Sequence, residues 1–257
     1  MTRDPLSPKN DLFFKLLFAE PNRLSLLQAF LRAALDLPAE EFDQLTIMDP
    51  HLQRGYPEDK LGILDAKILT KGGQTIDVEI QVEPQTHLWE RALYYAARMT
   101  TDQLKSGRDY REIHPVIGIF ILDWELIKED LNYHHRFRLY DERLDYAYPR
   151  LMEINILELP KLPERPDGSS LCDWLRLFTA RTREEFEMAA KAGSEIAQAV
   201  AVIMELSEDE RTRMLAESRE RYRRDEVARR EYAVQEERLK VARAALRENC
   251  RWRSSPS

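Results

Sequence analysis

Cysteine and glycine are scarce in this sequence. Its 257 residues contain two cysteines, Cys172 and Cys250, which stand far apart with no Cys-x-x-Cys spacing and no clustered histidine. Neither a disulfide framework nor a zinc site is therefore indicated, and a reducing compartment is expected. With 8 glycines, 43% hydrophobic residues and 33% charged residues, the composition is typical of a globular, helix-rich chain and not of a disordered one.

Long hydrophobic runs and an excess of positive charge are also missing. The longest apolar run, Pro115 to Leu122, is far too short to span a bilayer, and the first residues lack an apolar signal core. We therefore expect a soluble, cytoplasmic protein without membrane association. The net charge of -7 argues against polyanion binding through overall basicity, so any nucleic-acid contact has to come from a local patch.

The periodicity of apolar residues predicts an α/β fold. Helical spacing appears after Asn10, which can cap a helix, between Pro21 and Pro38, and from Trp89 to about Gly107. Strands are expected at residues 61–70, 75–83, 116–122 and 152–159. Apolar and polar residues alternate regularly over 75–83, so one face of that strand should be exposed to water, a wet face. This order predicts a mixed β-sheet flanked by helices.

A boundary is expected where prolines and charges gather, at residues 160–168. We assign residues 1–161 to the main domain and 162–257 to a helical C-terminal region. In that region residues recur at spacings of four and three, namely Ala228, Tyr232, Gln235, Leu239, Ala242 and Leu246. This weak heptad seam predicts a homo-oligomer through the charged C-terminal helix, although Ala and Gln make a poor coiled-coil core and a single helix is the alternative.

The register of the first two strands follows from their apolar positions. Ile76, Val78 and Ile80 can share a face with Leu64, Ala66 and Ile68 only if paired residue numbers have an even sum. A three-residue loop, Lys71-Gly72-Gly73, satisfies this condition and is a common hairpin type with glycine in the left-handed position. The predicted register places Asp65 directly opposite Glu79.

Two opposed carboxylates destabilise a sheet unless positive charge lies between them. A divalent cation such as Mg²⁺ would supply that charge, and it would keep coordination sites for a phosphate and an attacking water. Gln81 and Lys67, on the same face, would orient the water or neutralise developing charge. The alternative is an ordinary solvent-exposed charged face.

The hairpin pattern Asp65-x13-Glu79-x-Gln81 resembles the active-site signature of the PD-(D/E)XK nuclease superfamily. The chain is most similar to the recombination-promoting nuclease branch, also described as PD-(D/E)XK nuclease family transposases. Further residues carry the resemblance, over about residues 10–161: Asn10-Asp11-x-x-Phe14-Lys15-x-x-Phe18, Ile76-Asp77-Val78-Glu79-Ile80-Gln81, Arg91-x-x-x-Tyr95, Gln103-x-x-x-Gly107-x-x-Tyr110, the strand at 116–122 and Leu157-Glu158-Leu159-Pro160-Lys161.

The resemblance implies a restriction-endonuclease-like core and magnesium-dependent cleavage of DNA phosphodiesters, with Asp65 and Glu79 as metal ligands. Where the superfamily usually has a lysine after the glutamate, this chain has Gln81. Lys67 or Lys15 would then have to supply the positive charge of the missing lysine. The alternative for Lys15 is that it is an ordinary solvated lysine on its helix.

Two arginines are candidates for DNA contact. Arg91 and Arg98 lie on one helix and would bind phosphates as forked donors, or would pair with Glu83, Glu90 or Asp102. The leading hypothesis is a metal-dependent DNA endonuclease associated with recombination or mobile elements. Its alternatives are a catalytically inactive nucleic-acid-binding protein and an adaptor that oligomerises through the C-terminal helix.

Overall fold

A computed structural model describes residues 4–18, 20–51, 65–104, 106–143, 146–147 and 149–253. The start of the first predicted strand, residues 61–64, lies outside them. The chain divides into two units, Met1–Asp209 and Glu210–Ser257.

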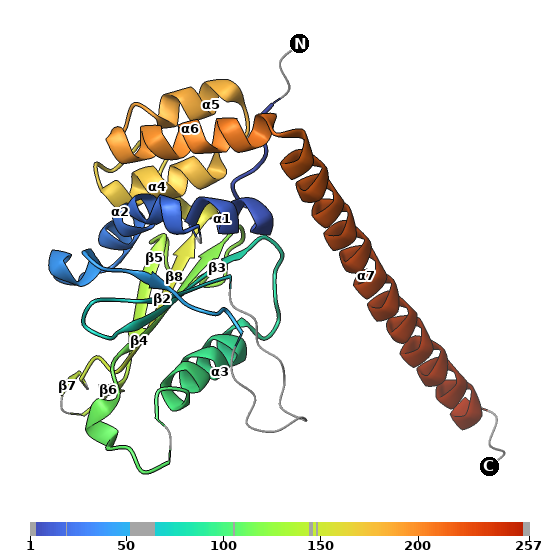
Figure 1. Ribbon diagram of the computed structural model, residues 1–257. Coiled ribbons are helices and arrows are strands. Elements are labelled where there is room, and N and C mark those ends of the chain that lie inside the picture. The colour runs from blue at the N-terminus through green and yellow to red at the C-terminus, as the bar shows by residue number, and fades with distance from the viewer. Residues whose placement is uncertain are drawn as a thin grey trace. The chain divides into compact units, whose positions relative to one another are not determined.

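The first unit is built on a mixed six-stranded sheet in the order β1-β2-β3-β4-β8-β5 (Figure 1). β3, β4 and β8 run parallel, whereas β1, β2 and β5 join antiparallel to their neighbours. The strands span Thr46–Ile47 (β1), Ala66–Leu69 (β2), Thr75–Gln81 (β3), Val116–Leu122 (β4), His134–Arg138 (β5) and Met152–Glu158 (β8), with a separate pair, Tyr140–Asp141 (β6) and Tyr146–Ala147 (β7). The predicted α/β class is confirmed, while β1 and β5 were not predicted.

Six α-helices accompany this sheet in the described part of the unit. They are α1 (Asp11–Phe18), α2 (Leu24–Ala34), α3 (Leu88–Thr101), α4 (Ser170–Thr179), α5 (Arg183–Ala189) and α6 (Ser194–Glu208). Short 3-10 turns, η1 (Pro21–Arg23), η2 (Ala39–Phe42), η3 (Tyr110–Glu112) and η4 (Leu159–Lys161), lie between them. The Asn10 side chain accepts from the Leu12 N–H at 3.1 Å and so caps α1 as predicted, whereas α3 ends at Thr101, earlier than the expected Gly107.

An aromatic cluster joins α1 and α2 to α4. Ring centroids of Phe18 and Phe30 lie 5.4 Å apart, and Trp174 and Phe178 of α4 lie within 6.0 Å of both rings. Such aromatic contacts bury large apolar areas. The compact unit therefore continues through α4 to Asp209, whereas the sequence-based domain boundary was placed at 161/162.

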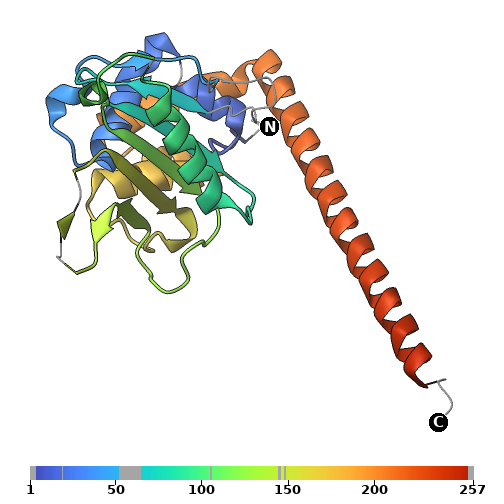
Figure 2. The same ribbon diagram turned by 90° about the horizontal axis from the view of Figure 1, so that it is seen from below.

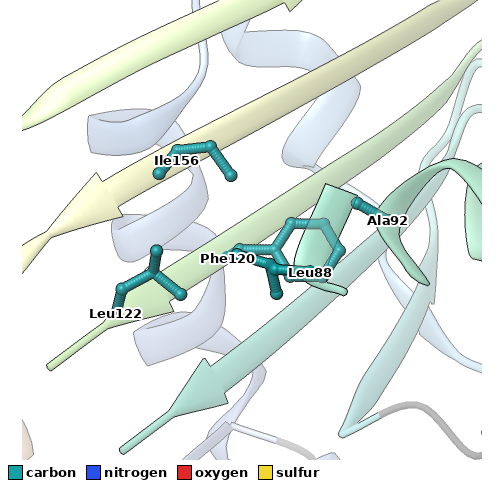
Figure 3. Close-up of a cluster of buried hydrophobic side chains, with 5 residues drawn as sticks. All are labelled: Leu88, Ala92, Phe120, Leu122 and Ile156. Atoms are coloured by element: carbon teal, nitrogen blue, oxygen red, sulfur yellow. The ribbon is translucent and has the colours of Figure 1, made fainter. Parts of the chain in front are cut away.

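Helix α3 covers one face of the sheet, and α1, α2 and α4 lie on the other (Figures 1 and 2). Beneath α3, Leu88 and Ala92 pack with three sheet residues, Phe120, Leu122 and Ile156 (Figure 3). In the β3–β4 register Glu79 pairs with Phe120 and Gln81 with Leu122, so the polar side of β3 shares this covered face. Every residue of β3 is buried, and the expected wet face is therefore wrong.

The second unit is one helix, α7 (Glu210–Arg253), 44 residues long. Of the predicted heptad positions, Tyr232 and Leu239 are exposed, while the side chains of Ala242 and Leu246 lie outside those described. The predicted self-association stays a prediction. Among the described residues no helix combines the length and apolar character needed to cross a bilayer.

Candidate active site

The hairpin β2–β3 has the register expected from the apolar pattern. Ala66 pairs with Val78 and Ile68 with Ile76, and the Thr70 N–H donates to the Gln74 carbonyl at 2.9 Å across the three-residue loop. Gly73 has φ +85°, a conformation that glycine adopts without strain. The same register, continued one step beyond β2, places Asp65 opposite Glu79.

The Asp65 and Glu79 side chains bond to each other's strand. Oε1 of Glu79 accepts from the Asp65 N–H, and Oδ2 of Asp65 accepts from the Ile80 N–H, both at 3.2 Å. The Glu79 side chain is 1% exposed and that of Asp65 is 17% exposed. Two carboxylates thus meet at the end of the hairpin, one buried and one reachable from solvent.

Three donors surround this pair. Nη2 of Arg91 lies 2.6 Å from Oε2 of Glu79, and Nε2 of Gln81 donates to the same oxygen at 2.9 Å. Nζ of Lys15, reaching from α1, lies 3.4 Å from Oδ1 of Asp65. The structure therefore brings together Lys15, Asp65, Glu79, Gln81 and Arg91, which the sequence had selected from four separate segments.

Two further residues hold Arg91, and sequence reasoning did not assign them to the site. Nε of Arg91 donates to the Tyr95 hydroxyl at 3.0 Å, and Nη1 donates to Oε1 of Gln85 at 2.9 Å. The guanidinium also lies 5.0 Å from the centroid of the Tyr95 ring. Gln85 in turn donates to Gln81. The spacing Arg91-x-x-x-Tyr95 could have indicated that Tyr95 contacts Arg91, because residues four apart are neighbours on a helix. Gln85 lies in a loop, and no sequence pattern indicated its contact with Arg91.

A third carboxylate, Asp77, lies on the same face of β3. It is 0% exposed, and neither of its oxygens has a hydrogen-bond partner among the described residues. Lys67 is opposite Asp77 in the register and is 8% exposed. The face formed by Lys67, Asp77 and Glu79 is therefore buried, and the alternative of a solvent-exposed charged face is wrong.

The family model of the PD-(D/E)XK nuclease family transposases matches residues 8–233. The chain belongs to this family. The mixed sheet flanked by helices is consistent with the restriction-endonuclease-like fold expected for it. No curated protein and no solved structure is significantly similar to the chain.

In this PD-(D/E)XK chain Asp65, Asp77 and Glu79 lie together and form an acidic face. This acidic face is electrostatically unfavourable without added positive charge. Burial and the neighbouring Asp65 raise the pKa of Glu79 to about 8, and Arg91 opposes that rise. Burial, Glu79 and Asp65 raise the pKa of Asp77 well above its usual range. Both shifts show that the protein disfavours negative charge here, which is the condition that a bound cation relieves.

The donor set of this PD-(D/E)XK site fits a hard divalent cation. Carboxylate oxygens are the ligands that Mg²⁺ prefers, and Mg²⁺ is commonly held by one or two carboxylates while it keeps several waters. The described residues contain no group of three or more His, Cys, Asp or Glu side chains arranged to hold a metal. Asp65 and Glu79 would offer such a cation two carboxylates, and their role as metal ligands stays a prediction.

Arg98, the other arginine selected from the sequence, lies farther along α3. It pairs with Asp102 at 3.9 Å, and it follows Arg91 by seven positions, about 10 Å along a helix axis. Of the two sequence alternatives for Arg98, the structure shows the pairing with Asp102. Contact with DNA stays a prediction for both arginines.

Proposed function

We propose that this chain is a Mg²⁺-dependent DNA endonuclease that hydrolyses phosphodiester bonds, in keeping with its membership of a nuclease family. The observation that carries the proposal is the meeting of Asp65 and Glu79 at the end of the hairpin. Two acidic side chains joined by 3.2 Å bonds to each other's strand, one of them fully buried, require compensation that a divalent cation supplies.

In the proposed site each residue has a distinct task. Asp65 and Glu79 hold the cation through their carboxylate oxygens, and a bound cation would polarise the phosphate and activate the attacking water. Gln81 holds Oε2 of Glu79 in place at 2.9 Å. Lys15, whose side chain is 34% exposed, is able to reach both Asp65 and a phosphate outside the protein.

Lys15 is our choice for the positive charge that the superfamily usually places after the glutamate. Its ammonium lies 3.4 Å from Asp65, whereas Lys67 faces the buried Asp77. A lysine beside a carboxylate ligand neutralises charge that develops on the phosphoryl oxygens, since it acts as a mobile point charge. Lys67 then compensates negative charge inside the acidic face, opposite Asp77.

A catalytically inactive, nucleic-acid-binding role is the second candidate. It is favoured by the ion pairs of both carboxylates with protein cations, Arg91 with Glu79 at 2.6 Å and Lys15 with Asp65 at 3.4 Å. Such a cluster is partly neutralised without metal. Cleavage assays separate this role from that of a nuclease.

The experiment is cleavage of supercoiled and linear DNA in Mg²⁺ or in EDTA by the wild type, Asp65→Asn and Glu79→Gln. Glu90→Gln is the matched control, because Glu90 is 72% exposed and the substitution changes the charge equally. Cleavage that needs Mg²⁺ and both carboxylates, and that survives Glu90→Gln, supports the nuclease. A folded wild type that binds DNA but never cuts it supports the inactive role.

An association with recombination or mobile elements is part of the proposal. It would appear as a difference in recombination frequency between cells that express the wild type and cells that express the Asp65→Asn variant.

A further inference from the structure

Arg91 occupies one of the two carboxylate oxygens of Glu79, the residue that the proposed site uses as a ligand for its cation. Its Nη2 lies 2.6 Å from Oε2, at a short, charge-assisted hydrogen-bond distance. Gln81 Nε2 donates to that same oxygen, and Oε1 accepts from the Asp65 amide. A cation that coordinates Glu79 through Oε2 therefore has to displace the guanidinium donor.

The guanidinium is held independently of Glu79. Nε is bonded to the Tyr95 hydroxyl and Nη1 to Gln85, and the group lies over the Tyr95 ring at 5.0 Å. Loss of the bond to Glu79 thus frees one donor, Nη2, without freeing the side chain. Arginine suits this arrangement because its five N–H donors are fixed in one plane, so three partners are bound at once.

We propose that Arg91 couples cation binding to DNA binding: its Nη2 donor pairs with Glu79 in the metal-free protein and, when a divalent cation takes Glu79, turns to an oxygen of a DNA phosphate. The inference rests on the proposed function and extends it. Before the cation binds, Arg91 compensates the buried carboxylate. Afterwards the same donor lies beside the cation, where the phosphate would bind, and Tyr95 and Gln85 set its position.

Two consequences follow from thermodynamic linkage. Arg91 competes with the cation for Glu79, so its removal should strengthen cation binding. Because the freed donor is available to DNA only after the exchange, the cation should strengthen DNA binding, and the two couplings are reciprocal. If Arg91 only formed a structural ion pair with Glu79, DNA binding would not depend on the cation through Arg91.

The first test measures Mn²⁺ binding without DNA by electron paramagnetic resonance, in the wild type, Arg91→Gln and Arg98→Gln. We expect Arg91→Gln to bind Mn²⁺ about tenfold more tightly, the effect typical of one hydrogen bond between charged groups. Arg98→Gln removes the same charge about 10 Å farther along the helix and should change the affinity less than about twofold. Equal affinities of the wild type and Arg91→Gln, or equal gains in both variants, overturn the exchange.

The second test uses Arg91→Lys, which keeps the positive charge beside Glu79 and so protects the fold if Arg91→Gln is unstable. Binding of a short fluorescent DNA duplex is measured by anisotropy in Ca²⁺ and in EDTA. Lysine cannot bond Tyr95, Gln85 and a third partner in one plane, so the gain in affinity from Ca²⁺ should be about tenfold smaller than in the wild type. An unchanged gain contradicts the proposal.

The outcomes distinguish this inference from the proposed function. A wild type that shows the exchange and the Ca²⁺-dependent gain, yet never cleaves DNA, refutes the endonuclease and leaves the role of Arg91 intact. A wild type that cleaves DNA in Mg²⁺ while Arg91→Gln has wild-type affinity for Mn²⁺ supports the endonuclease and refutes the exchange. If neither the wild type nor the variants bind Mn²⁺, both are refuted.

Discussion

Asp65 and Glu79 are linked through the backbone as well as through charge: the Asp65 amide donates to Glu79 Oε1, and Asp65 Oδ2 accepts from the amide that follows Glu79, each at 3.2 Å. The two proposed metal ligands thus also fasten the chain just before β2 to β3. A substitution at either position therefore has two separable effects, one on the cation and one on the hairpin.

Asp65→Asn and Asp65→Ala should separate these effects. Asparagine keeps an oxygen that accepts from the Ile80 amide, so we expect its free energy of unfolding to stay within about 1 kcal/mol of the wild type, whereas alanine leaves the amide unpaired and loses about 1–2 kcal/mol. Both should lower cleavage at least about 100-fold, because each removes a charged ligand. Urea denaturation and plasmid cleavage check the two quantities. Wild-type cleavage by Asp65→Asn would remove Asp65 from the catalytic site.

Asp77 should limit the stability of the protein. Its carboxyl group is fully buried and its oxygens have no hydrogen-bond partner among the described residues. Asp77→Asn retains the shape and removes the ionisable group, so we expect a gain of about 1–3 kcal/mol in the free energy of unfolding at pH 7. Thermal unfolding in EDTA measures it. Loss of stability would mean that Asp77 is needed as the counter-charge of Lys67.

Stability at acid pH should depend on His134. Burial lowers the pKa of His134 below its usual 6.5, although the bond to Asn155 opposes the shift, and its Nε2 lies 2.9 Å from Asn155 Oδ1. Since the unfolded chain then binds the proton more readily than the folded one, the contribution of His134 to the free energy of unfolding should fall as the pH drops through 6.5. The raised pKa values of Asp77 and Glu79 contribute with the opposite sign, so the effect of His134 is read from the difference between the wild type and the variant. His134→Gln should weaken this dependence, while His87→Gln, at a position 82% exposed, should not. Urea denaturation between pH 5 and 8 compares them.

The sequence predicted the hairpin and the central strands because their physical signals are local. Alternating apolar residues and the Gly72-Gly73 loop fix the β2–β3 register without help from the rest of the chain. The strand at 116–122 is confirmed over its full length, because an uninterrupted apolar run of seven residues fits a central parallel strand.

The missed features depend on tertiary contacts. β5 has the sequence His-His-Arg-Phe-Arg, which shows no apolar alternation, and it is a strand because β8 provides an edge and because Arg138 pairs with Glu153 at 2.6 Å. The wet face predicted for β3 failed for a similar reason: the sequence does not reveal that α3 packs over it. The role of Gln85 depends on the positions of Gln81 and Arg91 together.

A second buried ion pair lies at the end of β8. Glu158 is 0% exposed and Lys161 is 4% exposed, with Nζ 2.8 Å from Oε2. Oε1 of Glu158 accepts from the amides of Leu126 and Ile127 at 2.6 and 3.0 Å, and Lys161 also donates to the Ile127 carbonyl. These bonds fasten the loop after β4 to the end of β8, which gives the Glu158-x-x-Lys161 part of the family resemblance a structural role.

Lys161→Met should therefore be strongly destabilising. It leaves the Glu158 carboxylate buried without its cation, for which we expect a loss of about 3–5 kcal/mol in the free energy of unfolding. Lys128→Met, at an exposed position in the same loop, should change it by less than about 0.5 kcal/mol. Both are measured by urea denaturation. A small effect of Lys161→Met would show that another partner compensates Glu158, for which His135, with Nδ1 3.4 Å from Oε2, is placed.

Truncation tests the extent of the folded unit and the role of α7 together. A chain ending at Lys161 lacks Trp174 and Phe178, which complete the aromatic cluster with Phe18 and Phe30; because each buried aromatic contributes several kcal/mol, this chain should not fold. A chain ending at Asp209 keeps every described helix of the first unit and should melt cooperatively.

The same chain ending at Asp209 tests whether α7 forms a coiled coil. If it does, the full chain should sediment as an oligomer and the chain ending at Asp209 as a monomer. Identical oligomeric states would show that α7 does not form the interface. Mg²⁺-dependent cleavage should persist in the shorter chain, since Asp65, Glu79 and their partners all precede residue 210.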